Sequence, residues 1–199
     1  TNSFGGTIFK VGKYGLGDKV FELNKAAAEI SRKAAGDKYV LGSVGPTGKI
    51  LMMGDVTEEE LYAAFKVQVQ GLEAGGVDAI MIETMTDLDE ARLAIKAAKE
   101  NTACEVFCTM TFEKTVNGEF RSMMGIAPTD MVNTLIDAGA ELIGANCGNG
   151  IADMIGIVEE IRKANPEIPV LVHANAGMPI YNDGETVFPE TPKEMAELV

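Results

Sequence analysis

The stretch Leu142-Ile143-Gly144-Ala145-Asn146-Cys147-Gly148-Asn149-Gly150 has the pattern of a buried parallel strand that ends at a functional site. It begins as a short apolar run and ends as a glycine-rich turn, and an amphipathic segment follows it. The side chain at the carboxyl end of such a strand reaches the loops in which binding and catalytic groups are found. Cys147 is therefore the first candidate for a functional side chain.

Segments with the patterns of helices and strands alternate along the chain. The expected helices repeat apolar residues at i, i+3 and i+4, and the expected strands are near-continuous apolar runs. Three helix starts carry a capping box, namely Thr57 with Glu60, Asp87 with Glu90, and Thr191 with Glu194. Helices are predicted over 20–35, 57–76, 87–98, 128–139 and 152–161, with another starting at 191, and strands over 39–45, 78–84, 105–112, 141–147 and 169–175.

This alternation predicts an α/β protein with a parallel sheet covered by helices. A closed (β/α)8 barrel and an open doubly wound sheet both place sites at the carboxyl edge of the strands. The doubly wound sheet usually carries a Gly-x-Gly-x-x-Gly or phosphate-loop motif, and neither is present. We therefore expect a TIM barrel. Because 1–199 holds fewer than eight strands, we expect one domain that is a partial barrel, truncated at both ends and lacking the first and the last strand.

Two junctions between a helix and a strand resemble each other. Ala-Gly-Gly-Val-Asp-Ala-Ile at 74–80 is similar to Ala-Gly-Ala-Glu-Leu-Ile at 138–143. Aligning the strands that follow places Glu83 level with Asn146, and Thr84 level with Cys147. We expect these side chains to emerge at one height of the sheet.

Composition argues against several classes of protein. The 199 residues carry a formal net charge of -13, whereas nucleic-acid binders need clustered Lys and Arg. No apolar run approaches the roughly 20 residues of a membrane span, so we expect no membrane partner and a cytoplasmic protein. The three cysteines, Cys104, Cys108 and Cys147, are too few for a disulfide framework and are expected to be reduced. A single histidine, His173, excludes a metal site with several imidazoles from this chain.

These residues also have purely structural interpretations. A lone cysteine such as Cys147 is often a small buried hydrophobe. Cys104 and Cys108 lie away from the expected site edge and are interpreted as core or surface thiols. His173 is interpreted as a hydrogen-bonded core histidine. Glu83 could cap the next turn, but a carboxylate at the end of a buried strand needs a partner, which favours a functional role.

Five motifs together resemble the homocysteine S-methyltransferase family, and they follow the family's order over the whole chain. They are Thr1-Asn2-Ser3-Phe4-Gly5-Gly6, Gly45-Pro46-Thr47-Gly48, Ile82-Glu83-Thr84, Gly144-Ala145-Asn146-Cys147 and Ala174-Asn175-Ala176-Gly177-Met178-Pro179. The resemblance implies an enzyme that transfers a methyl group to the thiol of homocysteine and so forms methionine. It is closer to the cobalamin-dependent members, which implies methylcobalamin on another domain or protein as the methyl donor.

The resemblance also implies roles for single residues. Cys147 would be the catalytic zinc ligand, and Glu83 would hold the amino group of homocysteine. The residues that would line the same pocket are Asn2, Ser3, Phe4, Asn146 and Asn175. The family completes its zinc site with a Gly-Gly-Cys-Cys-Gly run that is absent from 1–199, so the remaining ligands are expected beyond Val199. A free thiol has a pKa of about 8.5 and is therefore mostly protonated at neutral pH. Zinc would bind the sulfur as the thiolate, which is the reactive form.

Two other functions fit the same residues. One is a metal-free barrel that binds a phosphate or pterin at Gly148-Asn149-Gly150, where the start of the next helix offers free amides. The other is a non-catalytic module that binds a thiol amino acid. Activity that a chelator abolishes would contradict the first, and homocysteine binding that survives zinc removal would identify the second.

Overall fold

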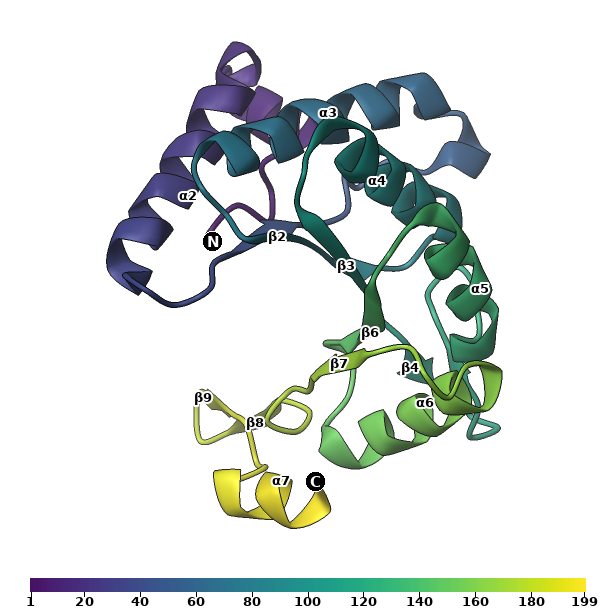
Figure 1. The fold of residues 1–199 in the computed structure, drawn as a ribbon. Coiled ribbons are helices and arrows are strands. Elements are labelled where there is room, and N and C mark those ends of the chain that lie inside the picture. The colour runs from purple at the N-terminus through teal and green to yellow at the C-terminus, as the bar shows by residue number, and fades with distance from the viewer.

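A computed structural model describes all residues from 1 to 199 and shows an α/β fold on a five-stranded sheet (Figure 1). The strands lie side by side in the order of the chain, and all neighbouring pairs are parallel. They are β1 (Leu41–Val44), β2 (Ala79–Met85), β3 (Glu105–Met110), β6 (Leu142–Asn146) and β7 (Val170–His173). Each lies within one of the strands predicted from the sequence, or differs from it by a single residue.

The long helices cover one face of this sheet. They are α2 (Val20–Ala35), α3 (Glu58–Ala74), α4 (Leu88–Asn101), α5 (Pro128–Ala138) and α6 (Ile151–Ala164). Figure 1 shows these helices on the convex side of the curved sheet. A sheet whose parallel strands follow chain order, with crossovers of one hand, places every connecting helix on the same face. The doubly wound arrangement, which needs helices on both faces, is therefore not the fold.

The sheet does not close. β1 and β7 each have a neighbour on one side only, so the structure contains no closed barrel. The structure thus confirms one part of the TIM-barrel prediction, the singly wound parallel sheet with helices on its outer face. It does not show the closed barrel. The physical reason is the number of strands, since closure of this kind of barrel takes eight.

The main core lies between the sheet and the helices. Fully buried side chains that reach it from the three central strands include Ile80, Ile82, Cys108, Ile143 and Ala145. Successive side chains of a strand point to opposite faces, so the residues between these face the concave side. The polar residues on that side near the carboxyl ends are Ser43, Glu83, Thr109, Asn146 and His173. The concave face is therefore polar where the strands end.

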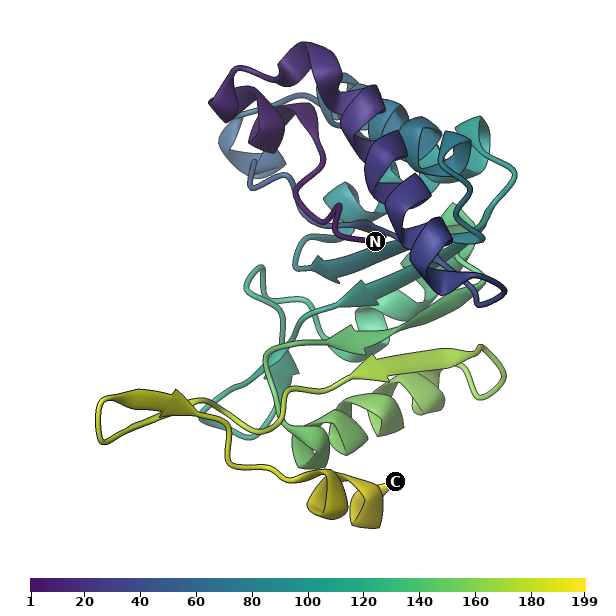
Figure 2. The same cartoon turned by 90° about the vertical axis from the view of Figure 1, so that its left-hand side faces the viewer.

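Several short elements have no counterpart among the predicted ones. Two-stranded hairpins form from β4 (Glu113–Lys114) with β5 (Phe120–Arg121) and from β8 (Ile180–Asn182) with β9 (Glu185–Val187). Figure 2 shows the β8–β9 hairpin projecting on the side to which the strands of the sheet point. The other short elements without a counterpart are α1 (Ile8–Val11) and the 3-10 turns Gly12–Tyr14, Gly17–Lys19 and Leu51–Met53, whereas α7 (Pro192–Leu198) is the helix predicted to start at 191. None of the helices combines the length and the apolar character that a membrane crossing requires.

Two of the three capping boxes are confirmed, at the starts of α3 and α7. The third is wrong in its second half. Asp87 does cap α4, because its carboxylate accepts from the backbone N–H groups of Asp89 and Glu90. Glu90, however, turns to Thr47 and accepts from its backbone N–H at 2.8 Å and its hydroxyl at 2.5 Å. The Glu90 side chain is buried, and Thr47 offers it two donors where the helix start offers one.

Candidate functional site

The carboxyl ends of β2, β3 and β6 meet around the side chain of Asn146. Its Oδ1 accepts from the backbone N–H of Thr84 at 2.8 Å and from the hydroxyl of Thr109 at 2.7 Å. Its Nδ2 donates to Thr84 Oγ1 at 2.7 Å and to Cys147 Sγ at 3.3 Å. An amide has two acceptor positions and two N–H donors, so all four are used. Asn146, only 3% exposed, thus ties three strand ends to the thiol of Cys147.

The two positions aligned by sequence, Thr84 and Cys147, share an unusual backbone conformation. Thr84 has φ 62° and Cys147 has φ 60°, both in the left-handed region. Residues other than glycine rarely adopt it, and a β-branched residue such as Thr84 does so only under constraint. The register of β2 against β3 shifts at this point, between Ile82 and Met85. Both strand ends therefore turn sharply and lie within hydrogen-bond reach of Asn146, although the ladder pairs Met85 with Met110 and Met110 with Ala145, which differs from the alignment.

Hydrogen bonds hold the backbone of Cys147 from two sides. Its N–H donates to the carbonyl of His173 at 3.1 Å, and its carbonyl accepts from the N–H of Asn149 at 2.8 Å. The next residue, Gly148, has φ +74°, and an added Cβ would lie 2.5 Å from the carbonyl oxygen of Phe112. Only glycine fits there, so the half-buried thiol of Cys147 sits on a rigid corner.

The opening loop lies along β1, beside the end of β2. The hydroxyl of Ser3 donates to the carbonyl of Ser43 at 2.7 Å, and the carbonyl of Ser3 accepts from the side chain of Gln68 at 2.8 Å. The carbonyl of Phe4 accepts from the N–H of Gly45 at 3.0 Å, while Asn2 is exposed. The loop that the sequence placed in the pocket is therefore fixed to the strand next to Glu83.

Glu83 is half-buried and accepts a short hydrogen bond from the hydroxyl of Ser43 through its Oε1. Ser43 thus links the opening loop, through Ser3, to the carboxylate. The sequence argument did not single out Ser43. The signal available was its place in the 39–45 strand, since a polar residue two positions before the Gly45-Pro46 turn faces away from the helix layer.

Asn175 follows β7 and joins the same edge through its backbone. Its N–H donates to the carbonyl of Asn149 at 3.0 Å, while the side chain of Asn149 donates to the carbonyl of Phe112 at 2.7 Å. The structure therefore brings the segment of Asn175 against the turn that follows Cys147. It gives the Asn175 side chain no partner in the protein, which leaves this amide free to bind a ligand.

The remaining sulfur and imidazole groups lie as follows. Cys108 is buried in the core and Cys104 is half-buried at the start of β3, which confirms their interpretation as structural thiols. Burial raises the pKa of both thiols, so neither is a ready nucleophile. The interpretation of His173 as a core histidine is wrong, because this residue is exposed. His173 ends β7, which has a neighbouring strand on one side only within residues 1–199.

The residues of 1–199 do not make a complete metal site. No group of three or more His, Cys, Asp or Glu side chains is placed so that it could hold a metal ion. Zinc in proteins usually has three or four protein ligands. Cys147 therefore supplies at most one ligand, and these residues alone do not assemble a zinc centre.

The start of α6, where the sequence suggested a phosphate or pterin site, already has an anionic partner. The N–H of Ile151 donates to the carboxylate of Glu190 at 3.2 Å. An added Cβ at Gly150 would lie 2.0 Å from Glu190 Oε1, so the carboxylate fills the space above the glycine turn. This contact occupies one of the amides that the alternative function would use, so a phosphate or pterin would have to displace Glu190.

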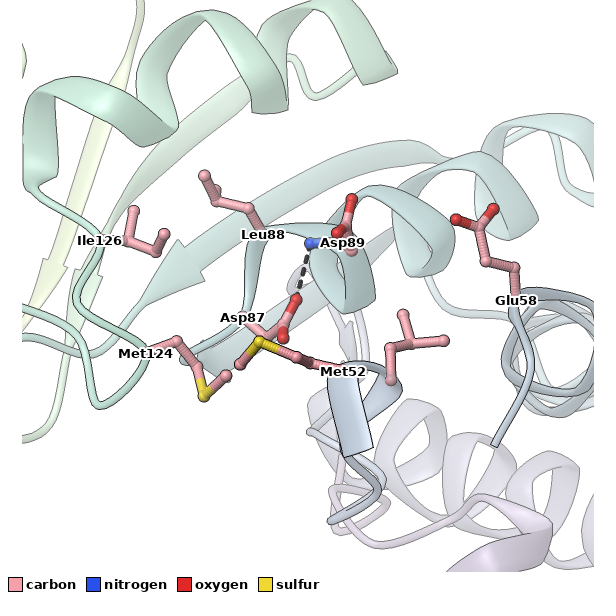
Figure 3. Close-up of a pocket in the computed structure, with 8 residues that line it drawn as sticks. Met52, Glu58, Asp87, Leu88, Asp89, Met124 and Ile126 are labelled. Atoms are coloured by element: carbon pink, nitrogen blue, oxygen red, sulfur yellow. Dashed lines mark hydrogen bonds between the residues drawn. The ribbon is translucent and has the colours of Figure 1, made fainter. Parts of the chain in front are cut away.

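The protein also has a surface cavity of about 510 Å³ (Figure 3). It is lined by Leu51, Met52, Glu58, Asp87, Leu88, Asp89, Met124 and Ile126. Met52 and Met124 both line it, and the Asp87 carboxylate accepts from the N–H of Asp89, as the dashed line in Figure 3 shows. None of the candidate site residues lines this cavity, so we assign it no part in the chemistry.

Comparisons with known proteins give matches along the whole chain. A family model described as homocysteine S-methyltransferase matches residues 1–199. The methionine synthases of Mycobacterium leprae and Mycobacterium tuberculosis are each 30% identical to the chain over 209 residues, which cover 99% of this chain. The chain spans only 17% of the length of these relatives.

Solved structures support the fold. The metallated form of the homocysteine methyltransferase MmuM from Escherichia coli matches with a TM-score of 0.74 and 21% identity, over 89% of this chain and 66% of that one. Its oxidized form matches with a TM-score of 0.71, also at 21% identity, over 93% of this chain and 65% of that one. At this identity the likeness concerns the fold alone.

Proposed function

Because the chain belongs to the homocysteine S-methyltransferase family, we propose that it is the homocysteine-binding part of an enzyme that methylates homocysteine to methionine. The observation that carries the proposal is the network around Asn146. It joins the end of β2, with Glu83 and Thr84, to the end of β6, with Cys147. The family motifs, scattered along the chain, thus meet at one edge of the sheet.

We also propose that the sheet is part of a (β/α)8 barrel. The strand order, the parallel pairing and the single layer of helices are those of a barrel segment. The concave side, which would be the barrel interior, carries its polar residues at the carboxyl ends of the strands. That is the end at which TIM-barrel enzymes bind their substrates.

In the proposed complex, Glu83 binds the ammonium group of homocysteine by a charge-assisted hydrogen bond. Ser43 holds one oxygen of this carboxylate, and the other is available to the ligand. Asn175 and the opening loop from Asn2 to Phe4 surround the amino-acid end. The homocysteine sulfur loses its proton and attacks the methyl carbon of the donor, so an S–C bond forms as the bond from donor to methyl breaks.

The cofactors remain proposals that follow from the family. Cys147 is the proposed catalytic zinc ligand of this chain, and the other ligands would come from residues beyond Val199. Methylcobalamin, carried by another domain or protein, is the proposed methyl donor, and the methionine synthases among the relatives favour this choice. The cytoplasm is the proposed location, because all three cysteines are free.

The test is a Cys147→Ala variant of the complete protein. We expect it to lose stoichiometric zinc and to form no detectable methionine, whereas the control Cys104→Ala keeps both. Zinc is measured by elemental analysis and methionine by chromatography. Full activity of Cys147→Ala would contradict the proposed mechanism. If calorimetry shows homocysteine binding that is unchanged by zinc removal, and no methionine forms, the chain is a binding module instead.

A further inference from the structure

Helix α6 begins without a capping side chain of its own. Its N-cap residue is Gly150, and no side chain of the preceding turn bonds to the first N–H groups. The partner comes from far along the chain, because the carboxylate of Glu190 accepts from the N–H of Ile151 at 3.2 Å. A carboxylate is favourable at this end of a helix, since it pairs with an unsatisfied N–H and with the positive end of the helix dipole.

Glu190 also closes the segment that carries the β8–β9 hairpin. Its backbone N–H donates to the carbonyl of Ala176 at 3.0 Å, which joins the two ends of 176–190. The hairpin strands themselves are exposed along their whole length, and Figure 2 shows them projecting from the molecule. The hairpin is therefore held at its base, where Glu190 lies.

Two glycines make room for this contact. An added Cβ at Gly150 would lie 2.0 Å from Glu190 Oε1. An added Cβ at Gly177, which has φ +78°, would lie 3.1 Å from Glu190 Cγ and 3.0 Å from Pro189 Cγ. Each glycine belongs to one of the two segments that Glu190 joins, so the side chain fits into a prepared space.

The two joined segments are those that flank the candidate site. One is the turn that follows Cys147, and the other begins at Asn175, whose N–H donates to the carbonyl of Asn149. We propose that Glu190 is a positioning residue of the homocysteine site. By capping α6 from a distance, it holds Asn175 and the base of the hairpin beside Cys147. The kinetic part of this inference rests on the proposed function, and the structural part stands without it.

The test compares Glu190→Ala and Glu190→Gln with Glu185→Ala in the complete protein. Glu185 is exposed in the same hairpin, and its side chain has no partner, so it controls for lost charge. A protease that cleaves at aspartate reports hairpin opening at Asp183. We expect Glu190→Ala to be cleaved about fivefold faster than wild type, the effect of losing one helix cap, and Glu190→Gln to be intermediate because its amide oxygen still accepts. The control should match wild type.

Steady-state kinetics should distinguish a role of Glu190 in positioning the homocysteine site from a general loss of protein stability. In Glu190→Ala we expect the KM for homocysteine to rise about fivefold with kcat nearly unchanged, and added formate, a small carboxylate, to lower that KM again. Gly150→Ala should open the hairpin as well, because its Cβ displaces the carboxylate. In the Glu190→Ala background it should add little further opening, since the atoms it displaces are gone.

Equal cleavage of Glu190→Ala and Glu185→Ala would overturn the proposal, and so would fully additive effects of Gly150→Ala and Glu190→Ala. Faster cleavage of Glu190→Ala in a protein whose wild type does not methylate homocysteine would support the cap and contradict the proposed function. The two ideas therefore fail in different measurements.

Discussion

Asn146 shows how one buried amide can set the geometry of a site. Its oxygen and nitrogen each bond to two groups of the protein, so the side chain has no donor or acceptor left for a ligand. We therefore propose that Asn146 does not bind the ligand itself but fixes the positions of the residues around the pocket. Its bonds hold Thr84 and Cys147 in backbone conformations that neither residue would adopt alone.

The Asn146→Asp variant tests this role. Aspartate keeps the acceptors but loses both donors, and it places a buried negative charge beside Thr84 Oγ1 and Cys147 Sγ. We expect a loss of about 2–4 kcal/mol in the free energy of unfolding, measured by urea denaturation. Asn117→Asp, at an exposed turn, should cost almost nothing. Equal losses in the two variants would show that the network does not constrain the strand ends.

Glu90 makes the free energy of unfolding depend on pH. Burial raises the pKa of this carboxyl above its ordinary value of 4.5, although the hydrogen bonds from Thr47 oppose the shift. The folded state therefore binds this proton more tightly than the unfolded state. The resulting stabilisation is present below the unfolded pKa and is lost as the pH rises through the folded pKa.

The Glu90→Gln variant should show how much Glu90 contributes to the pH dependence of the free energy of unfolding. Glutamine keeps an oxygen for both donors of Thr47 and carries no charge at any pH. We expect the free energy of unfolding of the variant to increase relative to wild type as the pH rises from below 4.5, the ordinary pKa of this carboxyl, toward neutrality, because wild-type Glu90 becomes charged. Urea denaturation of both proteins across this range measures it. A difference that does not change with pH would mean that burial does not shift this group.

Among the elements, the helices differ in where their caps come from. α3 begins with a local capping box, in which the N–H of Glu60 donates to Thr57 Oγ1 and the N–H of Thr57 donates to the Glu60 carboxylate. α6 takes its cap from Glu190, 39 positions after the residue that it caps. The first kind of helix start is visible in a sequence, and the second is not.

Removing the local cap of α3 should lower the free energy of unfolding by the amount usual for the loss of one helix cap. We expect Thr57→Ala to lower the free energy of unfolding by about 1 kcal/mol, because one N–H of the first turn loses its partner. Thr129→Ala is the matched control, since Thr129 is exposed in the first turn of α5. Thermal unfolding of the two variants should show a lower Tm for Thr57→Ala only. A Tm equal to that of the control would mean that the α3 box adds no stability.

For the molecule as a whole, β7 is one of the two edge strands of the sheet, and it pairs only with β6. Gly144, in β6, lets the two strands approach, since an added Cβ would lie 1.8 Å from the carbonyl oxygen of Leu171. The strand that leads to His173 and Asn175 is therefore placed next to Cys147 by a residue without a side chain.

Gly144→Ala should push this edge away. We expect it to lower the free energy of unfolding by about 1–3 kcal/mol and to speed amide hydrogen exchange in β7 more than in β2. Gly12→Ala should be nearly neutral, because an added Cβ there meets no atom within 4 Å. Uniform exchange across the sheet in Gly144→Ala would contradict a local effect at the edge.

The sequence by itself determined the elements and their order. The helix predicted over 20–35 is α2, with the same bounds, and the apolar runs became the five strands. It also indicated that the ends of the 78–84 and 141–147 strands lie together, and Asn146 does bond to both Thr84 and Cys147. These features could be predicted because caps, helical periodicity and apolar runs act over a few residues.

Only the tertiary structure decided the partners of the buried polar groups. Three carboxylates accept hydrogen bonds from donors about 40 positions away in the sequence. The pairs are Glu90 with Thr47, Glu190 with Ile151, and Glu83 with Ser43. A buried carboxylate must find donors, but which donors are in reach depends on how the strands and helices pack. No local pattern encodes these distances.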